Sequence, residues 1–364
     1  MPIDFNERRW EKIKDTYRLW WAGELDRPII PVELSGRDPG RDKPDIPLLS
    51  QATCTDMSIS PEDVVNRLDY ELSKVVYLGD AFPFFDMSCF GPGVVAAFLG
   101  ARLDNSTGLV WFYPQEDLPV TDLHFEYDPD NIWLKRIKDI CAAAIDYWQG
   151  QVLIGMPDLG GILDILSTFR PGEKLPLDLL DHPEEVNRLI WEVHEVWHCC
   201  FKEINQILQP INPGYSDWSG IYSNQPSCIL QCDFCYMIGS DMFDEFVKPE
   251  LKVTGEKLSR SFYHMDGPGQ LRHLDSLLTI DSIDGVQWVP GFDDPDSSHY
   301  PELFRKIHTA GKLIQCYAGF DELDAIIEQI GTGRGIHRHV KYGYSEITGS
   351  EYQIRKRLEK YGIE

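Results

Sequence analysis

The sequence lacks a membrane-spanning segment and is poor in positive charge. It contains no run of about 18 apolar residues, the minimum for a transmembrane helix. Its 34 lysines and arginines stand against 59 aspartates and glutamates, a formal net charge of −25 at pH 7. Because this charge repels phosphates and anionic lipids, neither a nucleic acid nor a membrane is expected as a partner. Residues 1–15 also lack the apolar core of a secretory signal, so we expect a cytoplasmic protein.

Two further absences bear on cofactors and on domain organisation. The chain has neither G-x-x-x-x-G-K-[ST] nor a G-x-G-x-x-G motif that follows a strand, which argues against ATP and dinucleotide use. No repeat, low-complexity tract or flexible linker divides the chain, so a single domain over residues 1–364 is predicted. The nine cysteines, an odd number, indicate reduced thiols rather than a disulfide framework.

What is present is a recurring unit: a short apolar run, a turn and an amphipathic stretch. The clearest strands are expected at residues 228–231, 262–264, 285–288 and 313–316, and helices at 240–261, 269–278, 300–310 and 320–330. Earlier in the chain, helices at 5–21, 61–77, 129–149 and 181–209 accompany strands at 28–34 and 152–155. These βα units predict an α/β fold, the (β/α)8 TIM barrel, with a doubly wound sheet as the alternative. The first helix is an N-terminal extension, and residues 79–128 form an elaborated segment.

The polar residues that follow the strands of a (β/α)8 barrel converge on one mouth, where the active site lies. The expected strand ends of this chain are rich in such residues. We predict catalytic roles for Asp233, His264 and Asp266. Substrate contacts are predicted for carboxylate, amide and indole side chains at other strand ends, namely Asp80, Asp158, Trp218, Gln287, Trp288 and Gln315.

A metal site is one interpretation of three of the strand-end residues. His264 and Asp266 are two positions apart in an extended segment, so their side chains project to the same side. Cys316 ends a strand two βα units later, where its thiolate could join them. A histidine, a carboxylate and a thiolate can hold zinc with one open coordination position. Two other interpretations stay open: His264 and Asp266 act as a metal-free acid–base pair, or all three residues are structural.

Two segments of the chain resemble a known family. Residues 230–238, LQCDFCYMI, and residues 242–251, MFDEFVKPEL, resemble the segment S-P-E-x-F-x-E-F-x-x-P-x-L of uroporphyrinogen decarboxylase-like proteins. In the corrinoid-dependent methyltransferase branch of that superfamily the next strand ends in His-x-Cys-Gly. Here it ends in His264-Met265-Asp266-Gly267. The resemblance is carried by motifs over residues 181–317 and mainly by layout over the first half.

This resemblance implies a (β/α)8 barrel and favours one of two chemistries. True uroporphyrinogen decarboxylases carry an arginine-rich N-terminal motif similar to R-Q-A-G-R, whereas residues 25–34 read LDRPIIPVEL. A substrate with eight carboxylates also suits a chain of charge −25 poorly. The methyltransferase branch holds zinc with His-x-Cys and a later cysteine, positions that His264, Asp266 and Cys316 match with aspartate in place of the middle cysteine. In that branch the zinc lowers the pKa of a substrate thiol, which takes a methyl group from a corrinoid.

Three functions follow from the residues together with what the resemblance implies. The first is a zinc-assisted methyltransferase that acts on a small substrate with a partner corrinoid protein, since the sequence shows no corrinoid-binding module. The second is a metal-free lyase, a decarboxylase of a small carboxylated compound. The third is a non-catalytic barrel that binds a corrinoid protein. The identity of the substrate and the formation of a homodimer stay open.

Overall fold

The computed structural model describes residues 2–291, 293–339 and 351–363. Its centre is a parallel sheet of five strands in the order β11-β10-β9-β8-β7. These strands are Ser227–Gln231 (β7), Arg260–Asp266 (β8), Gly285–Val289 (β9), Leu313–Tyr317 (β10) and Ile336–His339 (β11). Strand β7 is buried at every position and β8 at its five central positions. Such burial is typical of a parallel sheet that is covered on both faces.

Shorter strands continue this sheet or stand beside it. Ile29 forms a parallel bridge with His337 of β11, and the chain then enters β1 (Pro31–Ser35), which pairs antiparallel with β2 (Val75–Gly79). Strand β3 (Phe84–Phe85) pairs in parallel with β6 (Leu153–Ile154), and β4 (Arg102–Asp104) pairs antiparallel with β5 (Trp111–Tyr113). The fold is therefore mixed α/β, with a central parallel sheet whose strand order follows the chain.

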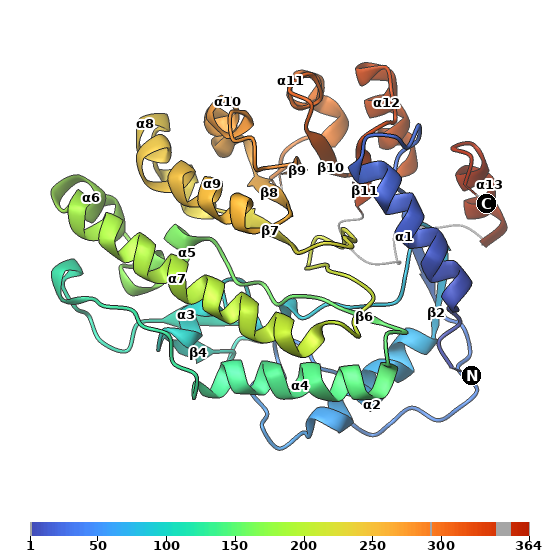
Figure 1. Cartoon of the computed structure of the whole chain (residues 1–364), viewed down its shortest axis with the longest axis horizontal. Coiled ribbons are helices and arrows are strands. Elements are labelled where there is room, and N and C mark those ends of the chain that lie inside the picture. Colours follow the sequence, from blue (N-terminus) through green and yellow to red (C-terminus); the bar gives the residue numbers. More distant parts are fainter. Residues whose placement is uncertain (1, 292, 340–350, 364) are drawn as a thin grey trace.

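Helices surround these strands, as Figure 1 shows. In the first part of the chain α4 (Ile132–Trp148) packs against both α2 (Pro61–Ser73) and α7 (Pro183–Leu208), while α1 (Glu7–Trp21) lies near β11. In the second part, four helices form a row along the outside of β7 to β11. They are α9 (Lys248–Lys257), α10 (Leu274–Leu278), α11 (Pro301–Thr309) and α12 (Phe320–Ile330). The remaining α-helices are α3 (Val95–Phe98), α5 (Ile162–Phe169), α6 (Lys174–Asp181), α8 (Ser240–Met242) and α13 (Glu351–Glu359).

Helix α2 illustrates how local sequence sets the ends of an element. The Ser60 side chain accepts a hydrogen bond from the Asp63 N–H at 3.1 Å, and Pro61 occupies the first helical position. The helix ends at Ser73 with Lys74 as C-cap, because Val75, Val76 and Tyr77 are β-branched or aromatic and pair with β1. The prediction of a helix over residues 61–77 was therefore wrong at its end, where strand pairing outweighs helix propensity.

The alternation of strands and helices predicted for residues 228–330 is confirmed. Two segments differ from expectation. Residues 162–181 contain α5 and α6, and residues 336–339 form β11; no element was predicted for either segment. A continuous cluster of buried hydrophobic side chains extends from Ile3 to Ile363. Among the described helices, none has both the length and the apolar character needed to cross a membrane.

Candidate functional site

One row of polar side chains crosses the parallel sheet. The strand register places Gln231, His264, Gln287, Gln315 and His337 side by side as Cα partners on β7 to β11. Since partners in adjacent parallel strands point to the same face, the five side chains lie on one face of the sheet. All five are buried, and His264 is the most exposed at 9%. Buried polar groups of this kind require hydrogen-bond partners.

A backbone carbonyl sets the direction of the hydrogen bonds in this row. The Nε2 atom of Gln315 donates to the carbonyl oxygen of Ser219 at 2.8 Å, so its Oε1 accepts from Nε2 of Gln287, at 2.6 Å. The Oε1 atom of Gln287 then faces Nδ1 of His264, and an amide oxygen can only accept. The ring proton of neutral His264 is therefore on Nδ1, and Nε2 carries a lone pair.

The same chain of bonds continues in the opposite direction. Gln315 Nε2 also donates to Nδ1 of His337, at 3.2 Å, and Nε2 of His337 donates to the Tyr17 hydroxyl at 3.0 Å. Burial lowers the pKa of His337 well below its usual range, so this ring is neutral and can accept at Nδ1. We call the chain from Tyr17 through His337, Gln315 and Gln287 to His264 the amide relay.

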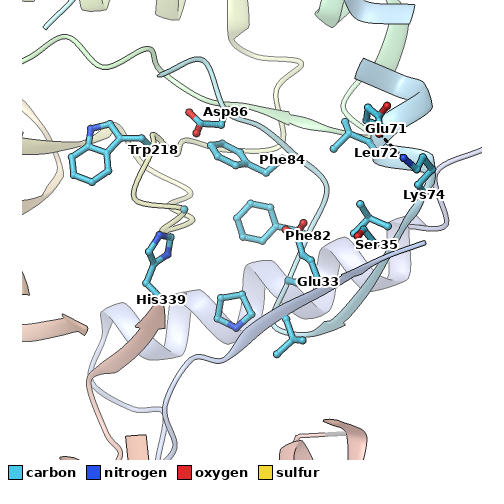
Figure 2. A pocket seen from close by; sticks show the side chains of 15 residues that line it. Glu33, Ser35, Glu71, Leu72, Lys74, Phe82, Phe84, Asp86, Trp218 and His339 are labelled. Carbon is cyan, nitrogen blue, oxygen red and sulfur yellow. Dashed lines mark hydrogen bonds and ion pairs between the residues drawn. The ribbon is translucent and has the colours of Figure 1, made fainter. Parts of the chain in front are cut away.

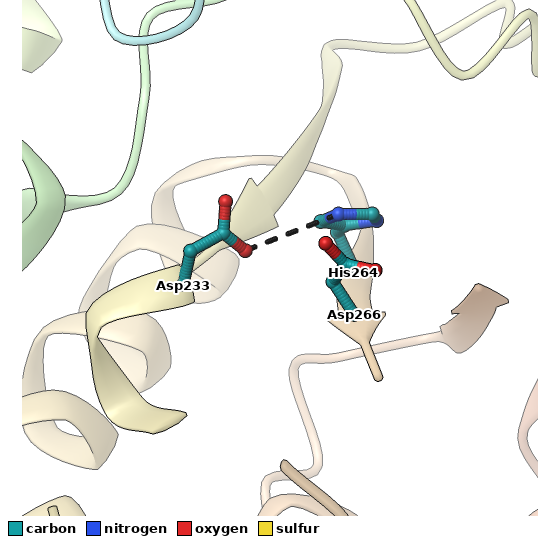
Figure 3. Close-up of side chains that lie close together, drawn as sticks. All are labelled: Asp233, His264 and Asp266. Atoms are coloured by element: carbon teal, nitrogen blue, oxygen red, sulfur yellow. Dashed lines mark ion pairs between the residues drawn. The ribbon is translucent and has the colours of Figure 1, made fainter. Parts of the chain in front are cut away.

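Figure 3 shows the ring of His264 beside two carboxylates, those of Asp233 and Asp266. Its Nε2 atom lies 4.0 Å from Oδ1 of Asp233, and one ligand atom from each of Asp233, His264 and Asp266 lies within 4.8 Å of the other two. We call these residues the Asp-His-Asp group. Zinc bonds of about 2.0 to 2.2 Å place two ligands of a tetrahedral ion about 3.4 Å apart. Side-chain rotation of the more exposed Asp233 and Asp266 can close this difference, so the residues fit a metal.

Two glycines allow the chain to assemble this group. Gly267 has a φ of 76°, a left-handed conformation that turns the chain directly after Asp266 at the end of β8. Gly161 begins α5 so close to β7 that an added Cβ would overlap the carbonyl oxygen of Gln231. This close approach lets Asp164 of α5 accept the N–H groups of Asp233, at 3.0 Å, and Phe234, at 2.7 Å. Asp164 thereby fixes the start of the 3-10 helix Asp233–Met237 that carries Asp233.

Two half-buried carboxyl groups, those of Asp158 and Asp164, lie near Asp233. Burial, together with the negative charge of Asp233, raises the pKa of Asp158 to about 7 and that of Asp164 to about 8. Hydrogen bonds from the N–H groups of Gly160, at 3.0 Å, and Gly93, at 3.4 Å, partly offset this effect at Asp158. Asp158 can therefore donate or accept a proton near neutral pH, which is the property of a general acid or base.

Comparison with solved structures shows a shared fold with a methyltransferase. The chain is similar to a "methyltransferase from Methanosarcina mazei", with a TM-score of 0.53 and 11% identity. The match covers 89% of this chain and 96% of that one. No family model and no curated protein matches the sequence. At this identity the likeness is one of fold alone.

Two predicted site residues lie on the other face of the sheet. Cys316 and Trp288 are Cα partners of each other, one position beyond the partners Gln315 and Gln287. Because side chains alternate along a strand, both point away from His264. Both are fully buried, and burial raises the pKa of the Cys316 thiol to about 12. The structure therefore places Cys316 outside the Asp-His-Asp group, and Trp288 packs on Tyr300 with ring centroids 4.8 Å apart.

Three other predicted substrate contacts are engaged within the protein. Gln287 and Gln315 are buried in the amide relay and hold other side chains. Asp80 forms a buried ion pair with Arg27, with two oxygen–nitrogen distances of 2.7 and 2.9 Å, and accepts the Ile30 N–H at 2.8 Å. Each of the three side chains therefore hydrogen-bonds to other protein groups, and a substrate contact for them stays a prediction.

Trp218 connects the site to a cavity. Its ring meets that of His264 edge to face, with centroids 4.9 Å apart and an interplanar angle of 87°. Trp218 also lines a cavity of about 500 Å³, shown in Figure 2, together with Asp86 and His339. His339 is two positions beyond His337 on β11, so it lies on the same face as the polar row but closer to the strand end.

The sequence did not point to three residues that organise the site. Asp164 lies in a helix that was not predicted, Ser219 acts through its main chain, and Tyr17 comes from the N-terminal helix. Only Asp164 had a local signal, since Gly160-Gly161 precedes an apolar stretch with a single carboxylate. The contribution of Ser219 depends on tertiary contacts alone.

Proposed function

We propose that this protein is a (β/α)8-barrel enzyme of the methyltransferase type, with zinc held by Asp233, His264 and Asp266. The fold shared with a methyltransferase supports the class. The five parallel strands, the bridge from Ile29 to β11 and the β3–β6 pair are consistent with a barrel. The sequence resemblance supports a small substrate and a partner corrinoid protein. Cys316 is left out of the ligand set because it points to the other face of the sheet.

One observation carries the metal proposal: the amide relay turns a lone pair of His264 toward carboxylate oxygens. When the His264 ring is neutral, its Nε2 and the Oδ1 of Asp233 are two electron-pair donors that lie 4.0 Å apart. A cation between them would satisfy both, and Asp266 would complete three ligands with one position open. A histidine whose second nitrogen donates to an amide oxygen is the usual arrangement at metal sites.

Each residue then has a role. Bound zinc would supply a Lewis acid that activates a small substrate at the open position. Gln287 would hold the His264 ring, and Asp164 would hold Asp233 through the main chain. Asp158 would donate or accept the substrate proton, since its pKa is about 7. Trp218 would limit the access of water to one side of the ring.

Metal analysis of protein purified without a histidine tag tests the ligand set. After dialysis against zinc and then against metal-free buffer, wild type should retain about one zinc ion per chain. His264→Ala and Asp266→Ala should lose it, whereas Cys316→Ala should keep it. Zinc in none of the proteins would remove the metal, and loss in Cys316→Ala with an unchanged circular dichroism spectrum would restore the thiolate ligand. Methyl transfer itself is measured as demethylation of methylcobalamin to cob(I)alamin, followed by absorbance, with candidate small acceptors.

A metal-free lyase is the second candidate, and Asp158 favours it. A carboxyl group with a pKa of about 7 can protonate a carbanion left by decarboxylation. Release of carbon dioxide from a small acid, unchanged by a chelator and abolished in Asp158→Asn, would support this function over methyl transfer.

A further inference from the structure

The cavity beside Trp218 has two chemically different ends. Its volume of about 500 Å³ is within the range of small-molecule sites. Figure 2 shows Trp218, Phe84, Phe82, Asp86 and His339 gathered at one end. The other end is lined by Glu71 and Lys74 from the junction of α2 and β2.

Aromatic rings dominate the first end. Phe82 and Phe84 meet edge to face with centroids 6.2 Å apart, and Trp218 enters from a different loop. The electron-rich faces of phenylalanine and tryptophan attract cations, most strongly where water is excluded. The wall therefore favours a ligand that is both apolar and positively charged.

Asp86 places a carboxyl group at this end of the cavity, and burial raises the pKa of this group. Its two oxygens accept hydrogen bonds from the N–H of Ser88, at 2.8 Å, and from the Ser88 hydroxyl, at 2.9 Å. Within the described ranges, no lysine, arginine or histidine forms an ion pair with it. Glu71 differs, since Lys74 lies 2.8 Å from it and Arg67 pairs with it as well.

The nearest ring that could carry a positive charge is neutral. His339 lines the cavity, but burial, with a smaller contribution from Arg338, lowers its pKa to about 4. An anionic ligand would therefore meet repulsion from Asp86 with no compensating charge. A neutral ligand would displace water from Asp86 without replacing its hydrogen bonds.

We propose that this cavity binds a small organic cation, with the ammonium group between Asp86 and the rings of Phe84 and Trp218. Trp218 also packs on His264, so one side chain contacts both the cavity and the Asp-His-Asp group. If the protein has the proposed function, the organic cation in this cavity would be its small substrate. This assignment as substrate rests on the proposed function, whereas the binding of a cation does not. Binding is an equilibrium property that is measured without turnover and without metal.

The probe is choline, titrated into protein treated with a chelator and followed by calorimetry. Its neutral carbon analogue, 3,3-dimethylbutan-1-ol, has the same shape without the charge, and ethanolamine separates a protonated amine from a methylated ammonium. Choline should bind at least about tenfold more tightly than the neutral alcohol. Tighter binding of ethanolamine than of choline would assign the site to protonated amines, which is still an organic cation.

Asp86→Asn should weaken choline binding by about tenfold or more and leave the neutral alcohol unchanged. Asp56→Asn is the matched control. Asp56 accepts from Ser58 in the same Asp-x-Ser arrangement, at 2.9 Å from the N–H, but lies on the surface outside the cavity. Phe84→Leu should also weaken the binding of choline more than the binding of the alcohol. This second variant tests the proposal if Asp86→Asn does not fold.

Three results would overturn the proposal: equal affinity for choline and the alcohol, equal loss of choline binding in Asp86→Asn and Asp56→Asn, or no binding of any cation at millimolar concentration. Zinc content is measured on separate samples. If the protein binds no zinc, choline binding can therefore still be observed. If the protein binds no choline, the measured zinc content is unaffected.

Discussion

Replacement of Gln287 by leucine tests the amide relay directly. The substitution removes the acceptor of the His264 Nδ1–H and the donor to Gln315 Oε1, while the volume at this fully buried position changes little. Each buried group left without a partner costs about 1–3 kcal/mol, so the free energy of unfolding should fall by a few kcal/mol. The His264 ring also loses the bond that keeps its proton on Nδ1.

The protonation of His264 can be observed by long-range ¹⁵N–¹H NMR correlation on protein labelled at histidine. The chain has ten histidines, so the His264 signals are assigned by their loss in His264→Gln. In its neutral form, the His264 ring of wild type should show the proton on Nδ1 and a bare Nε2. Gln287→Leu should show a mixture of the two forms. Zinc affinity should fall about 10- to 100-fold, as when other outer-shell partners of metal-binding histidines are removed.

Gln231→Leu provides the control. Gln231 is the Cα partner of His264 on the opposite side and is also buried, but no hydrogen bond joins the two side chains in the described part of the chain. This variant should retain the Nδ1-protonated ring. If Gln287→Leu also retained it, with zinc affinity within about twofold of wild type, the relay would not set the ring and our explanation of the site would fail.

Three further changes have directions fixed by the structure. For Asp158→Asn, the free energy of unfolding relative to wild type should increase by up to about 4 kcal/mol as the pH rises from about 4 to about 7. In wild type the folded carboxyl, with a pKa of about 7, stays protonated over this range while the unfolded carboxyl ionises, which destabilises the folded protein. Urea titrations at several pH values measure the difference. Arg27→Ala should cost about 3–5 kcal/mol in chemical denaturation, since it leaves buried Asp80 without its ion pair. Tyr17→Phe should cost about 1–3 kcal/mol, because Nε2–H of His337 loses its acceptor.

Each of these expectations has a clear contrary outcome. A pH-independent difference between wild type and Asp158→Asn would mean that the carboxyl titrates normally. Arg18→Ala, which breaks an exposed pair with Asp15, should change stability by less than about 1 kcal/mol, and an equal effect of Arg27→Ala would contradict burial of the Asp80 pair. If Tyr17→Phe had the same free energy of unfolding as wild type, Nε2–H of His337 would have another hydrogen-bond acceptor.

The sequence predicted the second half of the fold well because its signals are local. Apolar runs near residues 228, 262, 285 and 313 are short, regularly spaced and followed by amphipathic helices. Residues 75–77 were predicted as helix because they continue an amphipathic pattern, and only pairing with β1 reveals the strand. Strand β11 was missed because histidine and arginine occupy a buried strand, where their partners are distant in sequence.

The candidate site was predictable only in part for a related reason. The spacing of His264 and Asp266 places both on one side of a strand, and the structure brings Asp233 to them. The side to which Cys316 points depends on the register of β10 against β9, and a shift of one residue exchanges the faces. Spacing along the chain does not fix that register. The roles of Gln287 and Gln315 likewise depend on Ser219, which lies 96 residues from Gln315 in the chain.

The acidic groups near His264 link cation binding to proton release. Part of the elevated pKa of Asp158 comes from the charge of Asp233, in addition to burial. A divalent cation on Asp233 would cancel that charge and lower the pKa of Asp158, so zinc binding at pH 7 should release a fraction of a proton. Calorimetry in two buffers of different ionisation enthalpy measures this fraction, and Asp158→Asn should reduce it. Equal proton release in both proteins would show that Asp158 does not sense the cation, and a general acid or base at this position would then have to work independently of the Asp-His-Asp group.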